Sequence, residues 1–282
     1  MNDDLLLVMA ASSAGIQWPP TPSAVLTAAA AARRFSVEYH PIVASDDTSL
    51  AWRAKARFAD AQGNILSARA VFAALHANPA LLLATELQLK SLALAHAPAA
   101  SDLLLPLDAD SYAAAGAHSA GNAFDQLFSE HPRAIVEICE NQPLVDVARL
   151  QRLLHRLAAC GAPLAVSRQT PAATCLGEYL HDVDWLRIPC PADLRDPKSV
   201  RVLEAIAASA QQAGSIAIVS NVRDSATLAI VRAIGFAGAC GPLFEAQIVR
   251  TPEAQAFEAA QAWSESRWRQ AQINRQQAGG RS

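Results

Sequence analysis

The sequence predicts an α/β fold, a (β/α)8 TIM-like barrel, on three observations. Apolar segments of strand length alternate with helical patterns about eight times along the chain. Several of these segments are continuous apolar runs, as expected of parallel strands that are buried on both faces. The chain has 282 residues, of which 52% are hydrophobic and 17% charged, so it can bury one large core. We expect the barrel over 23–250, after an extension over 1–22 and before a helix and tail over 251–282.

The expected strands are short runs rich in apolar and β-branched residues, and the expected helices are the longer stretches between them. A turn at 62–64 separates the second strand from a long helical stretch, for which Ser67 is the expected N-cap. The strands are predicted at 35–43, 50–58, 102–107, 134–139, 163–167, 185–188, 216–220 and 239–244. The helices are predicted at 23–34, 67–95, 112–130, 145–160, 174–181, 197–213, 226–234 and 253–276.

Composition and charge favour a cytoplasmic protein. The net charge of −3 gives no general attraction to nucleic acid, and no helix-turn-helix signature is present. The five cysteines are dispersed without CxxC spacing, which is typical of reduced thiols and not of a zinc site or a disulfide framework. The N-terminus begins with acidic residues, unlike a signal peptide, and no apolar run approaches the ~20 residues that cross a bilayer.

Function in such barrels lies at the carboxyl ends of the strands, and here those ends are poor in acids and bases. Among the four continuous apolar runs, only the one over 134–139 has carboxylates at its end, those of Glu137 and Glu140. Three other strands end at Ser167-Arg168, Arg187-Ile188-Pro189 and Ser220-Asn221.

Five short segments in order carry a family resemblance. They are 39–43 (Tyr-His-Pro-Ile-Val), 53–57 (Arg-Ala-Lys-Ala-Arg), 137–140 (Glu-Ile-Cys-Glu), 161–166 (Gly-Ala-Pro-Leu-Ala-Val) and 235–242, which begins Gly-Phe and ends Cys-Gly-Pro. With this order and spacing the chain, from about 23 to 247, resembles the EAL domain of cyclic di-GMP phosphodiesterases. The first two segments stand where that family has Tyr-Gln-Pro-Ile-Val and its Glu-Ala-Leu-x-Arg signature.

The resemblance implies a catalytic site with two divalent cations and a lysine that activate water, and this chain departs from it. Such a site needs several hard oxygen ligands. Only Glu137 keeps its ligand identity, as a remnant. The remaining motif positions are occupied by Arg53, Pro106, Ser167, Arg168, Arg187 in place of the lysine, Pro189, Ser220, Asn221, Arg223 and Cys240. We therefore expect no metal, no other cofactor and no phosphodiesterase activity.

Four arginines are expected at the mouth of the barrel, and two interpretations of them stay open. They are Arg53, Arg57, Arg168 and Arg187. Their guanidinium groups could bind the phosphates of cyclic di-GMP directly, without metal, together with Glu137, Glu140 and His40. Alternatively they pair internally with Glu137, Glu140 and nearby aspartates, which we favour because buried charges need partners. His40 is expected to form hydrogen bonds at a strand end and not to act as a base.

The function we expect is that of a non-catalytic EAL-like regulator in bacterial signalling, acting through a protein partner. The resemblance implies, as one such partner, a transcription regulator that controls motility, virulence or biofilm genes. The alternative function is that of a metal-independent receptor for cyclic di-GMP. The last helix offers aromatic and cationic residues of the kind enriched in interfaces, unless its tryptophans pack on the barrel. They are Trp263, Arg267, Trp268 and Arg269. The family's dimer surface would fall near 169–178, which is heavily altered, so homodimerisation stays open.

Overall fold

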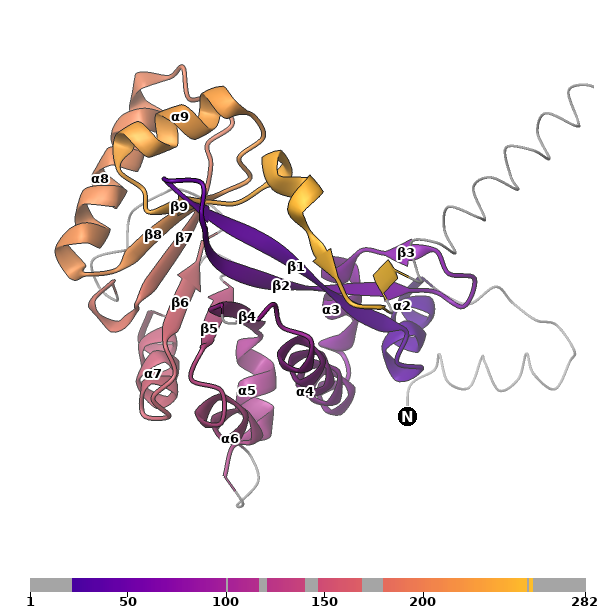
Figure 1. The fold of residues 1–282 in the computed structure, drawn as a ribbon. Helices are drawn as coiled ribbons and strands as arrows, with labels where there is room; N and C mark the ends of the chain where they lie inside the picture. The colour runs from indigo at the N-terminus through magenta and orange to yellow at the C-terminus, as the bar shows by residue number, and fades with distance from the viewer. Residues whose placement is uncertain are drawn as a thin grey trace, which may run out of the picture.

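Eight strands close into a barrel in the computed structural model, which confirms the predicted fold class (Figure 1). The structure describes residues 22–99, 101–116, 121–139, 147–168, 180–252 and 254–255. Around the ring the order is β1, β9, β8, β7, β6, β5, β4, β2, and pairing of β1 with β2 closes it. The strands are β1 (Phe35–Ala44), β2 (Ser49–Ala59), β4 (Leu103–Leu107), β5 (Ala134–Cys139), β6 (Leu164–Ser167), β7 (Trp185–Pro189), β8 (Ile216–Ser220) and β9 (Gly238–Ala239).

The direction of β1 corrects the expectation of an all-parallel barrel. This strand runs antiparallel to both of its ring neighbours, β2 and β9, whereas the pairs from β2 through β9 are parallel. The reason is the short turn between β1 and β2, because a parallel pair needs a crossover of a dozen or more residues. Two short strands, β3 (Ile65–Leu66) and β10 (Val249–Arg250), extend the sheet beside β2 and β1.

Helices α4 to α9 lie on the outer side of the ring (Figure 1). The helices are α2 (Pro22–Ala31), α3 (Ala68–Leu75), α4 (Pro79–Ala95), α5 (Ala109–Ala115), α6 (Ala123–Ser129), α7 (Val147–Ala158), α8 (Pro197–Ala213) and α9 (Ser225–Ile234), with 3-10 helices η2 (Leu180–Asp182) and η3 (Pro242–Gln247). Among the described residues, no helix is long and apolar enough to cross a membrane.

Three expected elements differ from the structure. The stretch 67–95 forms two helices, because Asn78 caps α4 by accepting from Leu81 N and the proline at position 79 cannot continue α3. The stretch 112–130 is divided between α5, which ends at Gly116, and α6. The strand expected at 239–244 is limited to β9 and continues as η3. Most of the helices expected at 174–181 and 253–276 lies outside the described residues.

The interior of the barrel is apolar toward the amino ends of the strands and charged toward their carboxyl ends. Buried side chains from seven strands fill the apolar part, namely Ile42, Ala51, Leu104, Ile135, Ala165, Trp185 and Ile218, together with Cys240. Side chains two positions apart on a strand point to the same face. The charged residues that follow two positions after Ala51, Ile135 and Trp185 are Arg53 on β2, Glu137 on β5 and Arg187 on β7. Strand alternation therefore places these three charges in one layer directly above an apolar floor.

Candidate functional site

Glu137 is the centre of the charged layer, and two arginines bind it. Its side chain has no solvent exposure. Arg53 Nε donates to Oε2 at 2.6 Å, and Arg187 Nε donates to Oε1 at 2.5 Å. The two carboxylate oxygens are therefore each engaged by a different guanidinium group, one from β2 and one from β7. This is the internal pairing that the sequence favoured for these two arginines.

The registers of β4, β5 and β6 show which residues flank Glu137 in the sheet. Glu137 lies beside Pro106 on β4 and beside Ala165 on β6. Pro106 carries no polar side chain and Ala165 is small, so neither strand neighbour offers Glu137 a charged partner. On β6 the residue opposite Arg187 is Ser167, two positions after Ala165.

Glu137 with its two partners, Arg53 and Arg187, forms what we call the ion-pair clamp, and this clamp determines the electrostatics of Glu137. Burial alone would raise the pKa of the carboxyl group, but the charges and hydrogen bonds of Arg187 and Arg53 outweigh burial and lower the pKa to about 2. Glu137 is therefore an ionised, fully buried carboxylate. Its charge is compensated by protein groups, as a buried charge requires.

The residues around Glu137 do not fit the pair of divalent cations that the resemblance implies. Both of its oxygens are occupied, and two of the surrounding groups are permanently cationic guanidinium groups. The neighbouring inward positions on the described strands, Pro106 and Ser167, supply one buried hydroxyl and no carboxylate. A hard dication needs several oxygen ligands, and the described residues around Glu137 do not provide them.

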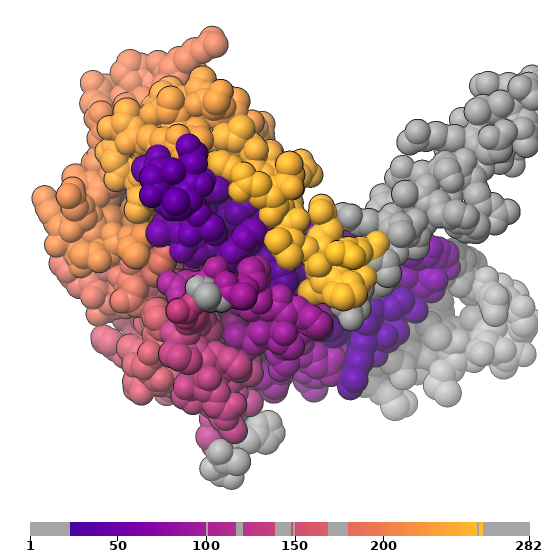
Figure 2. Space-filling model, in the orientation of Figure 1, coloured from indigo at the N-terminus to yellow at the C-terminus, as the bar shows by residue number. Residues whose placement is uncertain are grey.

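A second buried carboxylate, Glu38 on β1, forms a neighbouring cluster nearer the rim. Its Oε1 accepts from Arg57 Nε and Arg250 Nε, both at 3.0 Å, and its Oε2 lies 3.2 Å from His40 Nε2. Burial would raise the pKa of Glu38, but the His40 hydrogen bond and the charges of Arg57 and Arg250 lower it to about 2. Figure 2 shows the yellow C-terminal segment that includes β10 packed against indigo β1. Sequence reasoning missed this cluster.

His40 contacts Glu38 through a ring nitrogen, but it lies in the middle of β1 and not at a strand end as expected. Burial lowers its pKa, and the positive charges of Lys55 and Arg53 lower it further, against the opposing effect of Glu38. At neutral pH the ring is therefore uncharged. It contacts Glu38 on its own strand and lies opposite Arg53 in the β1–β2 register, between the two clusters.

The remaining predicted site residues fall into two groups. Arg168 follows β6, and its backbone N–H donates to the Arg187 carbonyl oxygen at 2.9 Å, which places it beside the layer. Glu140, the segment 169–178 and the four residues proposed for an interface lie outside the described residues. Those four are Trp263, Arg267, Trp268 and Arg269.

The two clusters together give the mouth an excess of positive charge. The cations on β1, β2, β7 and β10 at this end are Arg53, Lys55, Arg57, Arg187 and Arg250. The carboxylates of the two clusters are Glu38 on β1 and Glu137 on β5, so over these five described strands five positive charges stand against two negative charges. Such a mouth can hold an anion by direct guanidinium and ammonium contacts.

Comparison with known families decides what kind of barrel this is. The EAL domain family matches residues 23–247, which is most of the chain. The chain belongs to the EAL domain family. This is a signalling family of cyclic di-GMP phosphodiesterases, and the match covers both charged clusters except for Arg250. A comparison with curated proteins finds no significant match.

Solved EAL structures share the fold of this EAL domain at low sequence identity. An EAL domain protein from Listeria monocytogenes aligns with a TM-score of 0.65 at 16% identity, over 88% of this chain and 99% of the other. The PaMucR phosphodiesterase, in complex with c-di-GMP, aligns with a TM-score of 0.61 at 19% identity, over 82% and 97%. The FimX EAL domain from Pseudomonas aeruginosa, bound to c-di-GMP, aligns with a TM-score of 0.60 at 15% identity, over 79% and 94%.

Proposed function

We propose that this EAL domain is non-catalytic and acts as a regulator in cyclic di-GMP signalling. The observation that carries the proposal is the engagement of both Glu137 oxygens by Arg53 and Arg187. In the family resemblance, Glu137 is the one ligand position that keeps its identity. Here that ligand is committed to an internal ion pair.

The energetic argument concerns what a metal ion would have to displace. A dication at Glu137 would have to remove a guanidinium from a fully buried carboxylate and then lie within a few ångströms of two cations. Guanidinium groups stay protonated at any pH that a protein tolerates, so this repulsion cannot be relieved by titration. In a buried site it is also weakly screened by salt.

The regulatory output that we propose is contact with a protein partner. It is supported by a barrel that matches the EAL family over residues 23–247 while ion pairs engage the buried carboxylates at its mouth. The candidate contact surface remains the last predicted helix. A chain that ends after 255 tests it, because a folded truncated protein that still binds the partner would remove this surface.

A second candidate function is metal-independent binding of cyclic di-GMP. The excess of positive charge at the mouth favours it, since the ligand carries two phosphates and the cations could replace metal ions as their partners. Arg57 is the best placed, because it occupies the arginine position of the signature and is partly exposed. Binding would require Arg57 to exchange or share its contact with Glu38.

A hydrolysis assay tests the first proposal. Purified protein with Mg²⁺ or Mn²⁺ is expected to leave cyclic di-GMP intact, at the level of the Glu137→Gln variant. Linearisation of the dinucleotide at a rate that Glu137→Gln abolishes would overturn the proposal that the domain is non-catalytic.

Thermal unfolding with and without the dinucleotide, in the presence of a chelator, tests the second. Ligand at 100 times its dissociation constant stabilises a folded protein by about 2.7 kcal/mol, which a scan resolves. We expect Arg57→Ala to weaken binding about tenfold. Arg201→Ala, on the exposed side of α8, is the matched control and should bind as the wild type does. An unchanged melting temperature at high ligand concentration would exclude the receptor function.

A further inference from the structure

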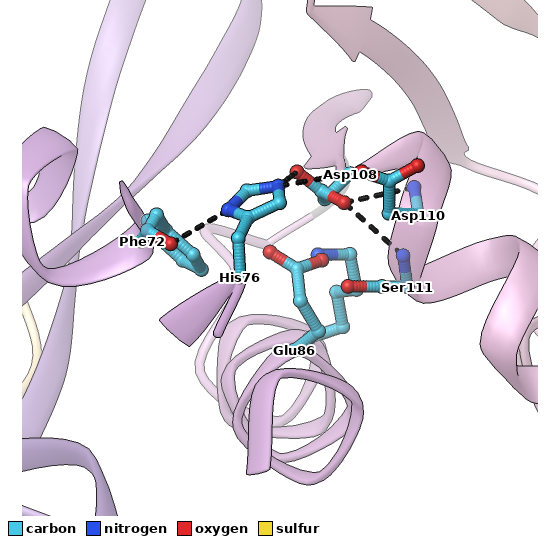
Figure 3. A network of polar contacts seen from close by, with 7 residues as sticks. Phe72, His76, Glu86, Asp108, Asp110 and Ser111 are labelled. Atoms are coloured by element: carbon cyan, nitrogen blue, oxygen red, sulfur yellow. Dashed lines mark hydrogen bonds and ion pairs between the residues drawn. The ribbon is translucent and has the colours of Figure 1, made fainter. Parts of the chain in front are cut away.

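A third polar cluster lies at the carboxyl end of β4, where the strand leads into α5. His76 is the C-cap residue of α3, Asp108 is the N-cap residue of α5, and Asp110 lies in the first turn of that helix. Figure 3 shows the three side chains pointing toward one another. The proposed function uses none of them.

The spacing of the three side chains matches the spacing of ligands around one metal ion. His76 Nε2 lies 3.1 Å from Asp108 Oδ2 and 3.7 Å from Asp110 Oδ2, and the three ligand atoms all lie within 4.8 Å of one another. Nitrogen and oxygen ligands about 2.0–2.2 Å from a zinc-type ion are separated by roughly 3.0–3.6 Å at octahedral and tetrahedral angles. The distance from His76 to Asp108 falls within this range, and the distance to Asp110 lies just above it.

The orientation of His76 is fixed by an atom outside this cluster. Its Nδ1 lies 2.7 Å from the carbonyl oxygen of Phe72, and since a carbonyl only accepts, Nδ1 must carry a proton. In the neutral ring, Nε2 then presents a lone pair toward the two carboxylates. A histidine whose second nitrogen donates to a backbone carbonyl is the usual arrangement of a metal ligand.

Asp108 is also oriented for one contact only. Its Oδ1 accepts from the backbone N–H groups of Asp110, at 2.9 Å, and Ser111, at 3.1 Å. The other oxygen, Oδ2, is left facing His76. Two carboxylates and one imidazole lone pair are all acceptors, so the space between them calls for a cation or a proton.

The hydroxyl of Ser111 is buried beside the cluster, on its inner side. Ser111 has no solvent exposure, and its Oγ has no protein hydrogen-bond partner among the described residues. Figure 3 shows it directed toward Glu86, on the inner side of Asp108. Glu86 is itself paired with Lys90.

We propose that His76, Asp108 and Asp110 bind one divalent transition-metal ion of the zinc class, with water completing its coordination. One imidazole and two carboxylates are ligands that Zn²⁺ and Co²⁺ accept, and the exposed Asp110 leaves the outer side open to solvent. The ion would tie the end of α3 to the start of α5. Its three residues are distinct from those of the Glu137 and Glu38 clusters.

The test is a titration of the tag-free, chelator-treated full chain with Co²⁺, followed by its absorption spectrum, and with Zn²⁺ by calorimetry. We expect one equivalent to bind. His76→Gln and Asp110→Asn should each weaken that binding by about 100-fold, as loss of a ligand does. Both positions are at least partly exposed, so the variants should fold, which circular dichroism checks.

The chain provides a matched control. His155 also faces a carboxylate, with Nε2 3.8 Å from Asp182 Oδ1, but this pair is not part of the three-residue cluster. His155→Gln should bind Co²⁺ as the wild type does. Absence of stoichiometric binding in the wild type, or binding that His76→Gln leaves unchanged, would overturn the proposal and leave His76 as a protonated partner of the two aspartates.

Discussion

Arg187 Nε lies 2.5 Å from Oε1 of Glu137, at a place where the carboxylate has no contact with solvent. The partner of such a charge cannot be replaced by water. The same pair that disfavours a metal ion therefore also stabilises the barrel, because it joins β5 to β7 across β6.

Removal of one arginine from Glu137 should be strongly destabilising. Arg187→Met leaves a buried carboxylate with a single guanidinium, and loss of one member of a buried ion pair typically costs about 3–5 kcal/mol. Urea unfolding measures the free energy of unfolding. Arg201→Met, on the exposed surface of α8, is the control and should change it by less than about 0.5 kcal/mol. Equal stabilities for the two variants would show that the clamp does not contribute to stability.

The clamp also predicts how stability depends on pH. The pKa of Glu137 is lowered from 4.5 to about 2, so its contribution is fully present above pH 4.5 and is lost as pH falls toward 2. A shift of this size corresponds to about 3 kcal/mol. The urea midpoint should fall over this range, and less steeply in Glu137→Gln. Identical pH profiles for the two proteins would contradict the lowered pKa.

Arg250 should hold β10 in place. This strand pairs with β1 at only two positions, and Arg250 adds the contact with Glu38. The backbone amide of Thr251 donates to the Val37 carbonyl oxygen at 3.2 Å. If Arg250→Ala lowers the local stability of β10 by about 1 kcal/mol, this amide should exchange its hydrogen about fivefold faster. Hydrogen exchange read by mass spectrometry measures this, with peptides from α8 as the internal reference. Unchanged exchange at 249–251 would assign the position of β10 to other contacts.

The break between α3 and α4 yields a prediction about capping. Asn78→Ala removes the side-chain oxygen that accepts from Leu81 N and should lower the free energy of unfolding by about 1 kcal/mol. Ser91→Ala, at an exposed position inside α4, is the control and should be neutral or slightly stabilising. If both substitutions had the same effect, the side-chain cap would not be what begins α4.

The sequence predicted best those elements whose limits are set locally. Helix α8 was predicted to the residue, because Asp196 caps its start and Gly214, with φ of 78°, ends it. The limits of β5 and β8 were also predicted exactly, since each is a short run of mainly β-branched and apolar residues, broken only by Glu137 in β5 and ended by Ser220 in β8. The direction of β1 was missed because alternation and composition are the same in parallel and antiparallel strands.

The candidate site was predicted in part. Pairing of Arg53 and Arg187 with Glu137 could be anticipated, because strand ends of one barrel face the same mouth. The Glu38 cluster could not, since alternation marks two faces of β1 and only closure of the ring decides which one points inward. Arg250, the partner of Glu38, lies 212 positions away in the sequence. No local pattern connects the two residues.

The antiparallel β1 also sets an order for assembly during synthesis. β1 can pair with β2 as soon as both have left the ribosome, but its other edge has to wait for β9, near residue 239. Until then the ring is an open sheet with an exposed hydrogen-bonding edge, the kind of surface that invites misassembly. Arg53, Glu137 and Arg187 all precede β9 in the chain. The ion pairs between Glu137 and the two arginines can therefore form in the incomplete sheet, before β9 pairs with β1 and closes the ring.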